Sequence, residues 1–411
     1  MMEEWKEYKL GELSIGKGSY GIGASAVPYS PSLHTYLRIT DINDDGTLNK
    51  NGLMSLDDEN ADDYILQPND IVFARTGNST GRSYFYDGSD GKLVYAGFLI
   101  KFSLDSKKVN PRILKYYTHS KPYFDWVRSF DTGGTRGNIN AKTYGDMPIV
   151  LPPRNLQDKI VSILKSLDDK IEVNRKINEN LEQQAQALFK SWFVDFEPFK
   201  NGEFVESELG MIPKGWRVGT LEEIGDIVGG STPSKSKPEY YTDKGIAWLT
   251  PKDLSISNNK FTSKGEIDIT EEGYKSCSTK LMPKGSVLFS SRAPIGYITI
   301  AKNDICTNQG FKSVVPRLAG TAFIYYFLKI STKDIENKAT GSTFKEASGA
   351  LMKSLQLIIA PERILHDFEN IMKPLFTQQE VLEDESRRLA ELRDTLLPKL
   401  MSGEFKVNEI A

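Results

Sequence analysis

Residues 178–199 read NENLEQQAQALFKSWFVDFEPF. The first half of this stretch is polar and favours a helix, and the second half is apolar and aromatic. It lies at the middle of a 411-residue chain, which is long enough for two domains, so a solvated linker would be expected there. We therefore predict that the midpoint belongs to a helix that packs against another part of the chain.

Residues before and within this stretch recur at alternating spacings of four and three. The seam consists of Ile160, Leu164, Leu167, Ile171, Asn174, Asn178, Leu181, Ala185 and Leu188. Adding 208 to each number gives a second seam with a similarly polar centre, whose apolar members are Phe368, Met372, Leu375, Leu382, Leu389 and Leu396. A period of 3.5 residues is typical of a left-handed coiled coil.

Segments outside the helices repeat as well. The similar pairs are PIVLPPR (148–154) with QLIIAPE (356–362), TGGTRGNIN (132–140) with TGSTFKEAS (340–348), and WKEYKLGEL (5–13) with WRVGTLEEI (216–224). A GEF tripeptide follows each seam. The repeat is circular, because the segment that would follow the second GEF is the one at the start of the chain.

We predict an α+β fold with two similar mixed globular target domains, separated by two long helices that pair as an antiparallel coiled coil about a pseudo-twofold axis. The predicted segments are residues 1–155, 156–200, 201–361 and 362–411. The alternative is that the helices are ordinary surface helices, each packed on its own domain. Asn174 and Asn178 either fix the register of the seam or lie in a wet part of it.

The globular halves combine β-like runs with turn signals and short helical pieces. Strands are expected within 36–42, 70–75, 95–102, 286–292 and 313–318, and helices within 111–128 and 321–337. The twin tyrosines Tyr116/Tyr117 and Tyr325/Tyr326 are predicted to pack in the core. The aromatic residues that end the first helix either pack on the second domain or form a docking surface for another protein; they are Trp192, Phe193, Phe196 and Phe199.

Composition narrows the class of protein. The only cysteines are Cys277 and Cys306, so a disulfide framework is not expected. No run approaches the roughly 18 apolar residues of a membrane span, and the acidic start differs from a signal peptide. We therefore expect a cytoplasmic protein without a membrane partner. The net charge of −3 argues against a generic nucleic-acid coat, so any DNA binding must come from local patches.

Polar loops after several predicted strands carry the side chains that DNA readout uses. Arginine can bond guanine edges, Asn and Gln can bond adenine edges, and hydroxyls and Lys can hold phosphates. The candidate DNA-binding residues of the first half are Arg75, Thr76, Asn78, Ser79, Arg82, Thr135, Arg136, Asn138 and Lys142. Those of the second half are Ser290, Ser291, Arg292, Asn308, Gln309, Lys312, Ser342, Thr343 and Lys345. Such loops are often only solvated turns, so the signal is weak without the repeat.

The segments that resemble catalytic or nucleotide-binding motifs lack residues that these motifs require. GELSIGKGS (11–19) has Gly18 where a phosphate-binding loop requires Ser or Thr. LPPR (151–154) lacks the polar and aromatic residues that flank the proline pair in amino-methyltransferases. The three histidines show no metal-ligand spacing, and no nucleophile can be matched with a base. We predict no catalytic residue, metal site or bound cofactor in this chain.

The whole pattern resembles the specificity subunit of type I restriction–modification enzymes. The segments that carry the resemblance are 151–198, beginning LPPRNLQDKIVSIL, and LRDTLLPKLMSGEF (392–405), with MPKGSVLFSSR (282–292) typical of its target-recognition domains. The resemblance implies that each globular domain reads one half of a bipartite double-stranded DNA target. It also implies that two modification subunits dock on the helices and bring S-adenosylmethionine, and that restriction subunits bring ATP and Mg²⁺.

Two other classes remain open from the residues: a coiled-coil scaffold with two ligand-binding domains and no DNA, and an enzyme with an unrecognised active site. Under the leading interpretation, the helices act as a ruler. From Ile160 to Leu188 is 28 residues, about 42 Å of helix. That length corresponds to roughly 12 base pairs at 3.4 Å each, a plausible distance between two half-site centres.

Overall fold

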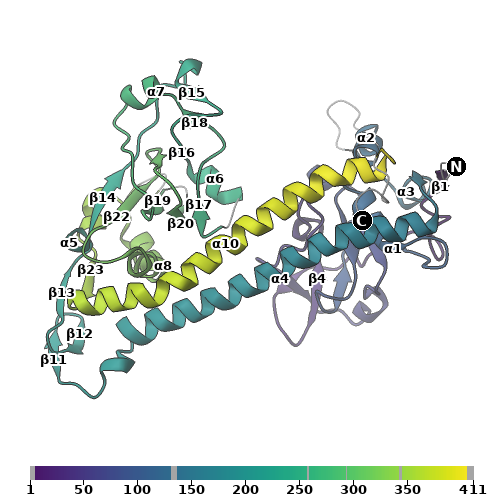
Figure 1. Ribbon diagram of the computed structural model, residues 1–411. Coiled ribbons are helices and arrows are strands. Elements are labelled where there is room, and N and C mark those ends of the chain that lie inside the picture. Colours follow the sequence, from purple (N-terminus) through teal and green to yellow (C-terminus); the bar gives the residue numbers. More distant parts are fainter. Residues whose placement is uncertain (1–4, 131–136, 257–258, 293, 342–344, 405–411) are drawn as a thin grey trace. The chain divides into compact units, whose positions relative to one another are not determined.

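The computed structural model describes residues 5–130, 137–256, 259–292, 294–341 and 345–404. The chain forms two compact units: unit 1 is Met1–Ile171 with Arg388–Ala411, and unit 2 is Glu172–Arg387. Both boundaries lie inside long helices, α4 (Arg154–Phe193) and α10 (Glu362–Met401), so each helix contributes a part to each unit (Figure 1). The four segments predicted from the sequence instead treat each helix as a segment of its own, at 156–200 and 362–411.

The described residues of unit 1 form two four-stranded sheets, one two-stranded pair and three short helices. The first sheet has the order β2 (Ser19–Tyr20), β9 (Leu99–Ser103), β6 (Asp70–Ala74), β7 (Ser83–Tyr86). The second has the order β3 (Val27–Pro28), β5 (Met54–Leu56), β4 (His34–Leu37), β8 (Leu93–Tyr95). The helices are α1 (Pro111–Tyr117), α2 (Lys121–Arg128) and α3 (Ala141–Gly145). Every residue of β6 is buried, as in β7 and β8, and β6 lies between β9 and β7 in the first sheet.

Unit 2 contains one five-stranded sheet and several two-stranded pairs. The sheet has the order β14 (Gly225–Gly229), β22 (Lys312–Pro316), β19 (Val287–Ser291), β20 (Ile295–Ala301), β17 (Phe261–Thr262). The pairs are β11 (Phe204–Ser207) with β12 (Gly210–Pro213), β15 (Tyr241–Thr242) with β18 (Asp268–Ile269), and β16 (Trp248–Leu249) with β21 (Cys306–Thr307). The helices are α5 (Leu221–Ile224), α6 (Pro251–Ile256), α7 (Glu271–Lys275), α8 (Thr321–Lys338) and α9 (Gly349–Lys353).

The two units repeat one arrangement, as the sequence predicts. In unit 1, β1 (Lys6–Lys9) pairs antiparallel with β10 (Pro148–Leu151); in unit 2, β13 (Arg217–Thr220) pairs antiparallel with β23 (Gln356–Ile359). These strands lie in the segments whose similarity suggested the repeat. The order β2-β9-β6-β7 in the first sheet of unit 1 also matches the order β14-β22-β19-β20 in the five-stranded sheet of unit 2. The circular character is confirmed, because unit 1 takes the end of the chain together with its beginning.

The long helices run antiparallel to each other in both units. In unit 1, Arg393 Nη1 of α10 donates a hydrogen bond to Asp168 Oδ1 of α4 at 3.0 Å. In unit 2, Asn174 Nδ2 donates to Glu385 Oε2 at 2.8 Å, and further along α4 the ring centroid of Phe193 lies 4.8 Å from that of Phe368. Residue numbers therefore rise along α4 as they fall along α10. The predicted pairing is confirmed within each unit.

The seam residues turn inward. Ile160, Leu164, Phe368 and Met372 are fully buried, and Leu382 is nearly so. The other apolar members are half-buried: Leu167, Ile171, Leu181, Leu188, Leu375, Leu389 and Leu396. The helices pair with each other and also pack on the globular part. Ile160 and Leu164 share one hydrophobic cluster with Leu397 of α10 and with Ile149 of the globular part. Asn174 is fully buried and bonded across the seam, which favours the register role over a wet position.

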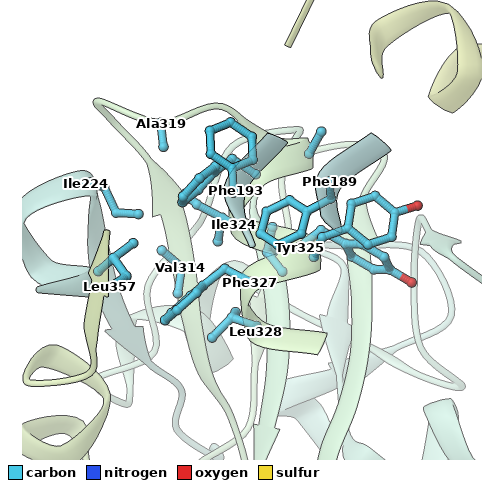
Figure 2. Packing of buried hydrophobic residues seen from close by; sticks show 14 of the residues in the cluster. Phe189, Phe193, Ile224, Val314, Ala319, Ile324, Tyr325, Phe327, Leu328 and Leu357 are labelled. Atoms are coloured by element: carbon cyan, nitrogen blue, oxygen red, sulfur yellow. The ribbon is translucent and has the colours of Figure 1, made fainter. Parts of the chain in front are cut away.

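The aromatic end of α4 packs on the second globular domain (Figure 2). Phe193 lies edge-on to Phe323 of α8, with ring centroids 4.8 Å apart. Beyond the helix, Phe196 and Phe199 contact the ring of Trp216 at 5.5 and 5.0 Å. Of the two alternatives left by the sequence, packing on the second domain is therefore the correct one.

Secondary structure differs from the predictions in two places. The run at 36–42 is a strand only to Leu37, after which residues 39–41 form a 3-10 turn fixed by Arg38 and Asp41. The run at 95–102 is divided between β8 and β9, because a turn closed by the Leu99 N–H and the Ala96 carbonyl at 2.8 Å interrupts it. The twin tyrosines are all buried, which confirms their core role. None of the described helices combines the length and apolar character of a membrane span.

One partly buried carboxylate of α4 contacts both α10 and the globular part of unit 1. Asp168 Oδ2 accepts hydrogen bonds from Lys115 Nζ at 2.8 Å and from the Tyr116 hydroxyl at 3.0 Å, while Oδ1 accepts from Arg393. Burial alone would raise the pKa of Asp168, but the charges and hydrogen bonds of Lys115 and Arg393 outweigh burial and lower it.

We expect Asp168→Asn to reduce the free energy of unfolding of unit 1 by about 3 kcal/mol at pH 7, because it leaves the partly buried Lys115 without its counter-ion and Arg393 with only the exposed Asp394. The folded-state pKa lies below the unfolded value near 4, so this stabilisation is complete above that value and is lost as the pH falls through the folded pKa. Hydrogen exchange at pH 7 and in acid measures both effects. Asp169→Asn, whose side chain is 57% exposed, is the matched control. A deficit that persists undiminished in acid would contradict the electrostatic explanation.

Candidate nucleic-acid interface

Three loops of unit 1 meet at one end of its first sheet. The loop after β6 begins at Arg75, whose N–H donates to the Phe98 carbonyl at 3.1 Å and whose carbonyl accepts from the Ile139 N–H at 3.0 Å. The Thr80 hydroxyl donates to the Gly137 carbonyl at 3.0 Å. The structure thus brings the predicted loops around 75–82 and 137–142 together, and adds the turn at 96–98.

Arg75 is the centre of this loop cluster. Its guanidinium lies over the Tyr20 ring, with Cζ 5.0 Å from the centroid, and Nη2 donates to Asn138 Oδ1 at 3.5 Å. The Tyr20 hydroxyl is itself held, as it accepts from the Ala141 N–H at 3.1 Å. The ring and Asn138 restrict the guanidinium, whose Nε is buried without a partner, and leave Nη1 available to a ligand. Tyr20 is a site residue that the sequence reasoning missed, since no motif marks it.

The other predicted residues of unit 1 divide into three groups. Asn78, Asn138 and Lys142 are exposed, and Thr76 and Ser79 are half-buried, so all five lie at the surface. Arg82 is engaged within the unit: it donates to the Ile42 carbonyl at 3.2 Å and pairs with Asp44 at 2.6 Å. Thr135 and Arg136 lie outside the described residues.

The equivalent end of the unit 2 sheet carries Arg292, directly after β19. Arg292 Nη1 pairs with Glu346 Oε2 at 3.2 Å, and Lys312 Nζ pairs with the other carboxylate oxygen at 3.1 Å. Asn308 is half-buried, and its Oδ1 accepts from the Gly310 N–H at 2.8 Å. Gln309 is exposed and accepts from the Thr232 hydroxyl. Lys345 is exposed and donates to the Glu336 carbonyl at 3.3 Å. Ser342 and Thr343 lie outside the described residues.

Two predicted contacts of unit 2 are corrected. Ser290 and Ser291 are fully buried because they end the central strand of the five-stranded sheet. The Ser290 hydroxyl donates to the Pro294 carbonyl at 2.8 Å and accepts from the Tyr297 N–H, and the Ser291 hydroxyl donates to the Gly310 carbonyl at 3.2 Å. Both side chains therefore stabilise turns and do not face a ligand.

A cleft of about 620 Å³ opens beside Arg292. Its lining residues are Thr232, Lys235, Tyr241, Trp248, Thr250, Pro251, Lys252, Asp253, Glu266, Ile267, Arg292, Asn308, Gln309 and Gly310. Three cationic side chains and two amides line the cleft together with the carboxylates of Asp253 and Glu266, and Glu266 pairs with Lys252 at 2.9 Å. Arg292, Lys235 and the amides remain as donors of the kind that DNA phosphates and base edges require. The sequence reasoning identified Arg292, Asn308 and Gln309 but missed Lys235, which lies in a turn, and Lys252, which lies in α6; both join the cleft only through folding.

The segments that resembled enzyme motifs have structural roles. GELSIGKGS runs from the turn after β1 to the start of β2, and no helix follows it in this described stretch, so the phosphate-binding loop geometry is missing. Arg154 of the LPPR segment begins α4, where it bonds Asp158 and the Ser106 carbonyl. Among the described residues, no group of three or more His, Cys, Asp or Glu side chains is placed to hold a metal ion.

Comparison with known proteins extends these observations. The family described as "Type I restriction modification DNA specificity domain" matches residues 2–183 and 213–388, which is one copy for each repeat. The HindI specificity subunit of Haemophilus influenzae is 26% identical over 98% of this chain and 100% of its own. The MjaIX specificity subunit of Methanocaldococcus jannaschii is 39% identical over 44% of each chain, so this chain spans less than half of that relative.

A solved structure has the same fold. The crystal structure of the type I restriction–modification S subunit from M. genitalium superimposes with a TM-score of 0.61 at 16% identity, covering 97% of this chain and 96% of that one. The circular repeat, the paired helices and the two family matches together cover most of the sequence. On these grounds the chain belongs to the family of type I restriction–modification specificity subunits, with two target-recognition domains.

Proposed function

We propose that each globular domain of this chain reads one half of a bipartite double-stranded DNA target. The observation that carries the proposal is the repeated sheet end: an arginine follows β6 in unit 1 and β19 in unit 2, and each is surrounded by Asn, Thr or Lys side chains. Arginine at a fixed position is the side chain best suited to guanine, and amides suit adenine. Neither domain needs a basic surface as a whole, because base readout depends on a few side chains.

The proposal extends to partners. Two modification subunits dock on the α4–α10 pair and supply S-adenosylmethionine and DNA adenine methylation, and restriction subunits add ATP- and Mg²⁺-dependent cleavage. The chain itself contributes recognition only, and the length of its helices sets the gap between half-sites. The relatives' names, which are those of type I restriction enzymes, support this assembly. The cytoplasmic setting stays a prediction, in keeping with two cysteines that are free thiols.

A salt titration of DNA binding tests the proposal against the scaffold alternative. The logarithm of the affinity of the assembled chain for duplex DNA should fall linearly with the logarithm of salt concentration, because each neutralised phosphate releases a counter-ion. Enrichment from a duplex library with randomised half-sites and varied gaps should yield two short conserved blocks. A scaffold that takes no DNA would show neither the slope nor the blocks.

Arg75→Ala should weaken binding to the selected target by roughly 5- to 150-fold, the equivalent of 1–3 kcal/mol, if its guanidinium reads a base. The matched control is Lys107→Ala, since Lys107 is exposed and follows β9, whose Ser103 end lies beside Asp70 at the opposite end of the sheet from Arg75. Equal losses in the two variants, in a filter-binding or fluorescence titration, would assign Arg75 no reading role.

A further inference from the structure

One carboxylate in unit 2 holds two cations of the candidate interface. Glu346 Oε2 pairs with Arg292 Nη1 at 3.2 Å, and Oε1 pairs with Lys312 Nζ at 3.1 Å. Exposure falls along this row, from 37% for the Arg292 side chain and 35% for Glu346 to 18% for Lys312. Lys312 therefore anchors Glu346 from the interior, and Glu346 in turn holds Arg292 at the surface.

The backbone around Glu346 is fixed by the same sheet. Arg292 and Glu346 form an antiparallel bridge, and the Ala347 N–H donates to the Ser291 carbonyl at 2.9 Å. Lys312 begins β22, the neighbour of β19. All three side chains thus start from backbone that is held by strand pairing, so their mutual geometry is set by the fold before any ligand arrives.

The contact leaves most of the guanidinium available. Arginine has five N–H donors, and Glu346 occupies one nitrogen, Nη1. Among the described residues, the Arg292 guanidinium has no second hydrogen-bond partner, and it borders the cleft beside Asn308 and Gln309. The edge formed by Nε and Nη2 can still meet the O6 and N7 acceptors of guanine.

Unit 1 has a weaker contact of the same kind, between an arginine and an acceptor side chain. The repeat offset of 208 residues places Asn138 where unit 2 has Glu346. Asn138 accepts from Arg75 Nη2 at 3.5 Å, a longer contact to a neutral group, and the Tyr20 ring supplies the rest of the orientation. The two arginines are one position out of register, because the Arg75 carbonyl accepts from the Ile139 N–H as the Ser291 carbonyl accepts from the Ala347 N–H. Each domain nevertheless holds an arginine beside the end of its strand, by a tyrosine ring in unit 1 and by a charged pair in unit 2.

We propose that Glu346 is a positioning residue that, anchored by Lys312, orients Arg292 to read a guanine in the half-site of the second domain. This inference rests on the proposed function. A carboxylate that merely competed with DNA would need no anchor of its own and would gain nothing from a backbone bridge to the arginine that it holds. A guanidinium held on one side is preorganised, so specificity is gained without the cost of ordering a long side chain on binding.

The test uses the full chain assembled with its modification subunits and a duplex library randomised in the second half-site. In wild type, one position should select guanine. Glu346→Gln should reduce that selection by roughly tenfold, within the range of a lost bidentate contact, while the other positions keep their preferences. Arg292→Ala should abolish it, and the double variant should be no worse than Arg292→Ala alone. Glu346→Asp, which keeps the charge, should restore part of the selection.

Two further variants keep the result decisive. Arg292→Lys preserves the pair with Glu346 but lacks the planar fork, so guanine selection should weaken while the salt dependence stays near that of wild type. Glu206→Gln makes the same charge change on an exposed residue of the β11–β12 hairpin and should alter nothing. A Glu346→Gln variant that binds all sequences more tightly with unchanged base preference would overturn the proposal and make Glu346 a competitor. If wild type itself selects no bases, the proposed function fails instead.

Discussion

Replacing Phe193 by Ala is expected to cost unit 2 about 3–5 kcal/mol of stability, the usual range for removing a buried phenyl ring. Phe193 is 7% exposed and its ring centroid lies within 5.3 Å of those of Phe189, Phe323 and Phe368. It therefore joins α4 to both α8 and α10 within one cluster (Figure 2). The surrounding rings are held by several elements, so the site cannot collapse to fill the cavity.

Hydrogen exchange is the suitable measurement, because a chain with two compact units need not unfold in one step. Peptides from residues 205–256 and 294–338 should lose protection in Phe193→Ala, while peptides from residues 5–130 keep theirs. Val194→Ala removes an exposed neighbour, 46% accessible, and should leave both sets unchanged. Uniform loss of protection over the whole chain would show that the two units unfold together, and no loss would show that the cluster is not the core of unit 2.

Exchanging the first recognition domain should replace one half of the DNA target completely and leave the other half unchanged. The structure refines the boundary for such an exchange. Lys6 of β1 pairs with Leu151 at the end of β10, so a graft should run through residue 151 to keep this two-stranded sheet within one parent sequence. The junction then falls at Pro152 and Pro153, before α4 begins at Arg154.

The graft must also fit the helices. Ile149 and Leu151 of β10 share a cluster with Ile160, Leu164 and Leu397, so a donor with similar seam residues is needed. Sequencing of methylated DNA from cells that express the chimera with its modification subunits gives both half-sites in one experiment. The matched control replaces the same segment with that of a relative of identical target. Changes in both halves after the first exchange would contradict independent reading by the two domains.

The sequence alone predicted the repeat, the seam and the two-domain plan, because these depend on patterns that are local or periodic. A 3.5-residue period specifies the face by which a helix packs, whichever partner covers it, so Ile160, Leu164, Phe368 and Met372 could be assigned to the interior. Similar strands at a constant offset imply the same pairing in both halves, and β1–β10 and β13–β23 confirm it.

Tertiary structure decided which polar side chains face outward and which are already engaged. Ser290 and Ser291 have the composition of a DNA-binding loop, yet they are buried inside the sheet as the last two residues of β19. Tyr20, Lys235 and Glu346 join their sites from segments distant in sequence, and a single sequence holds no record of such contacts. Periodicity therefore determined the scaffold, while the chemistry of the reading surface emerged only where strand pairing brought separate loops to the same end of a sheet.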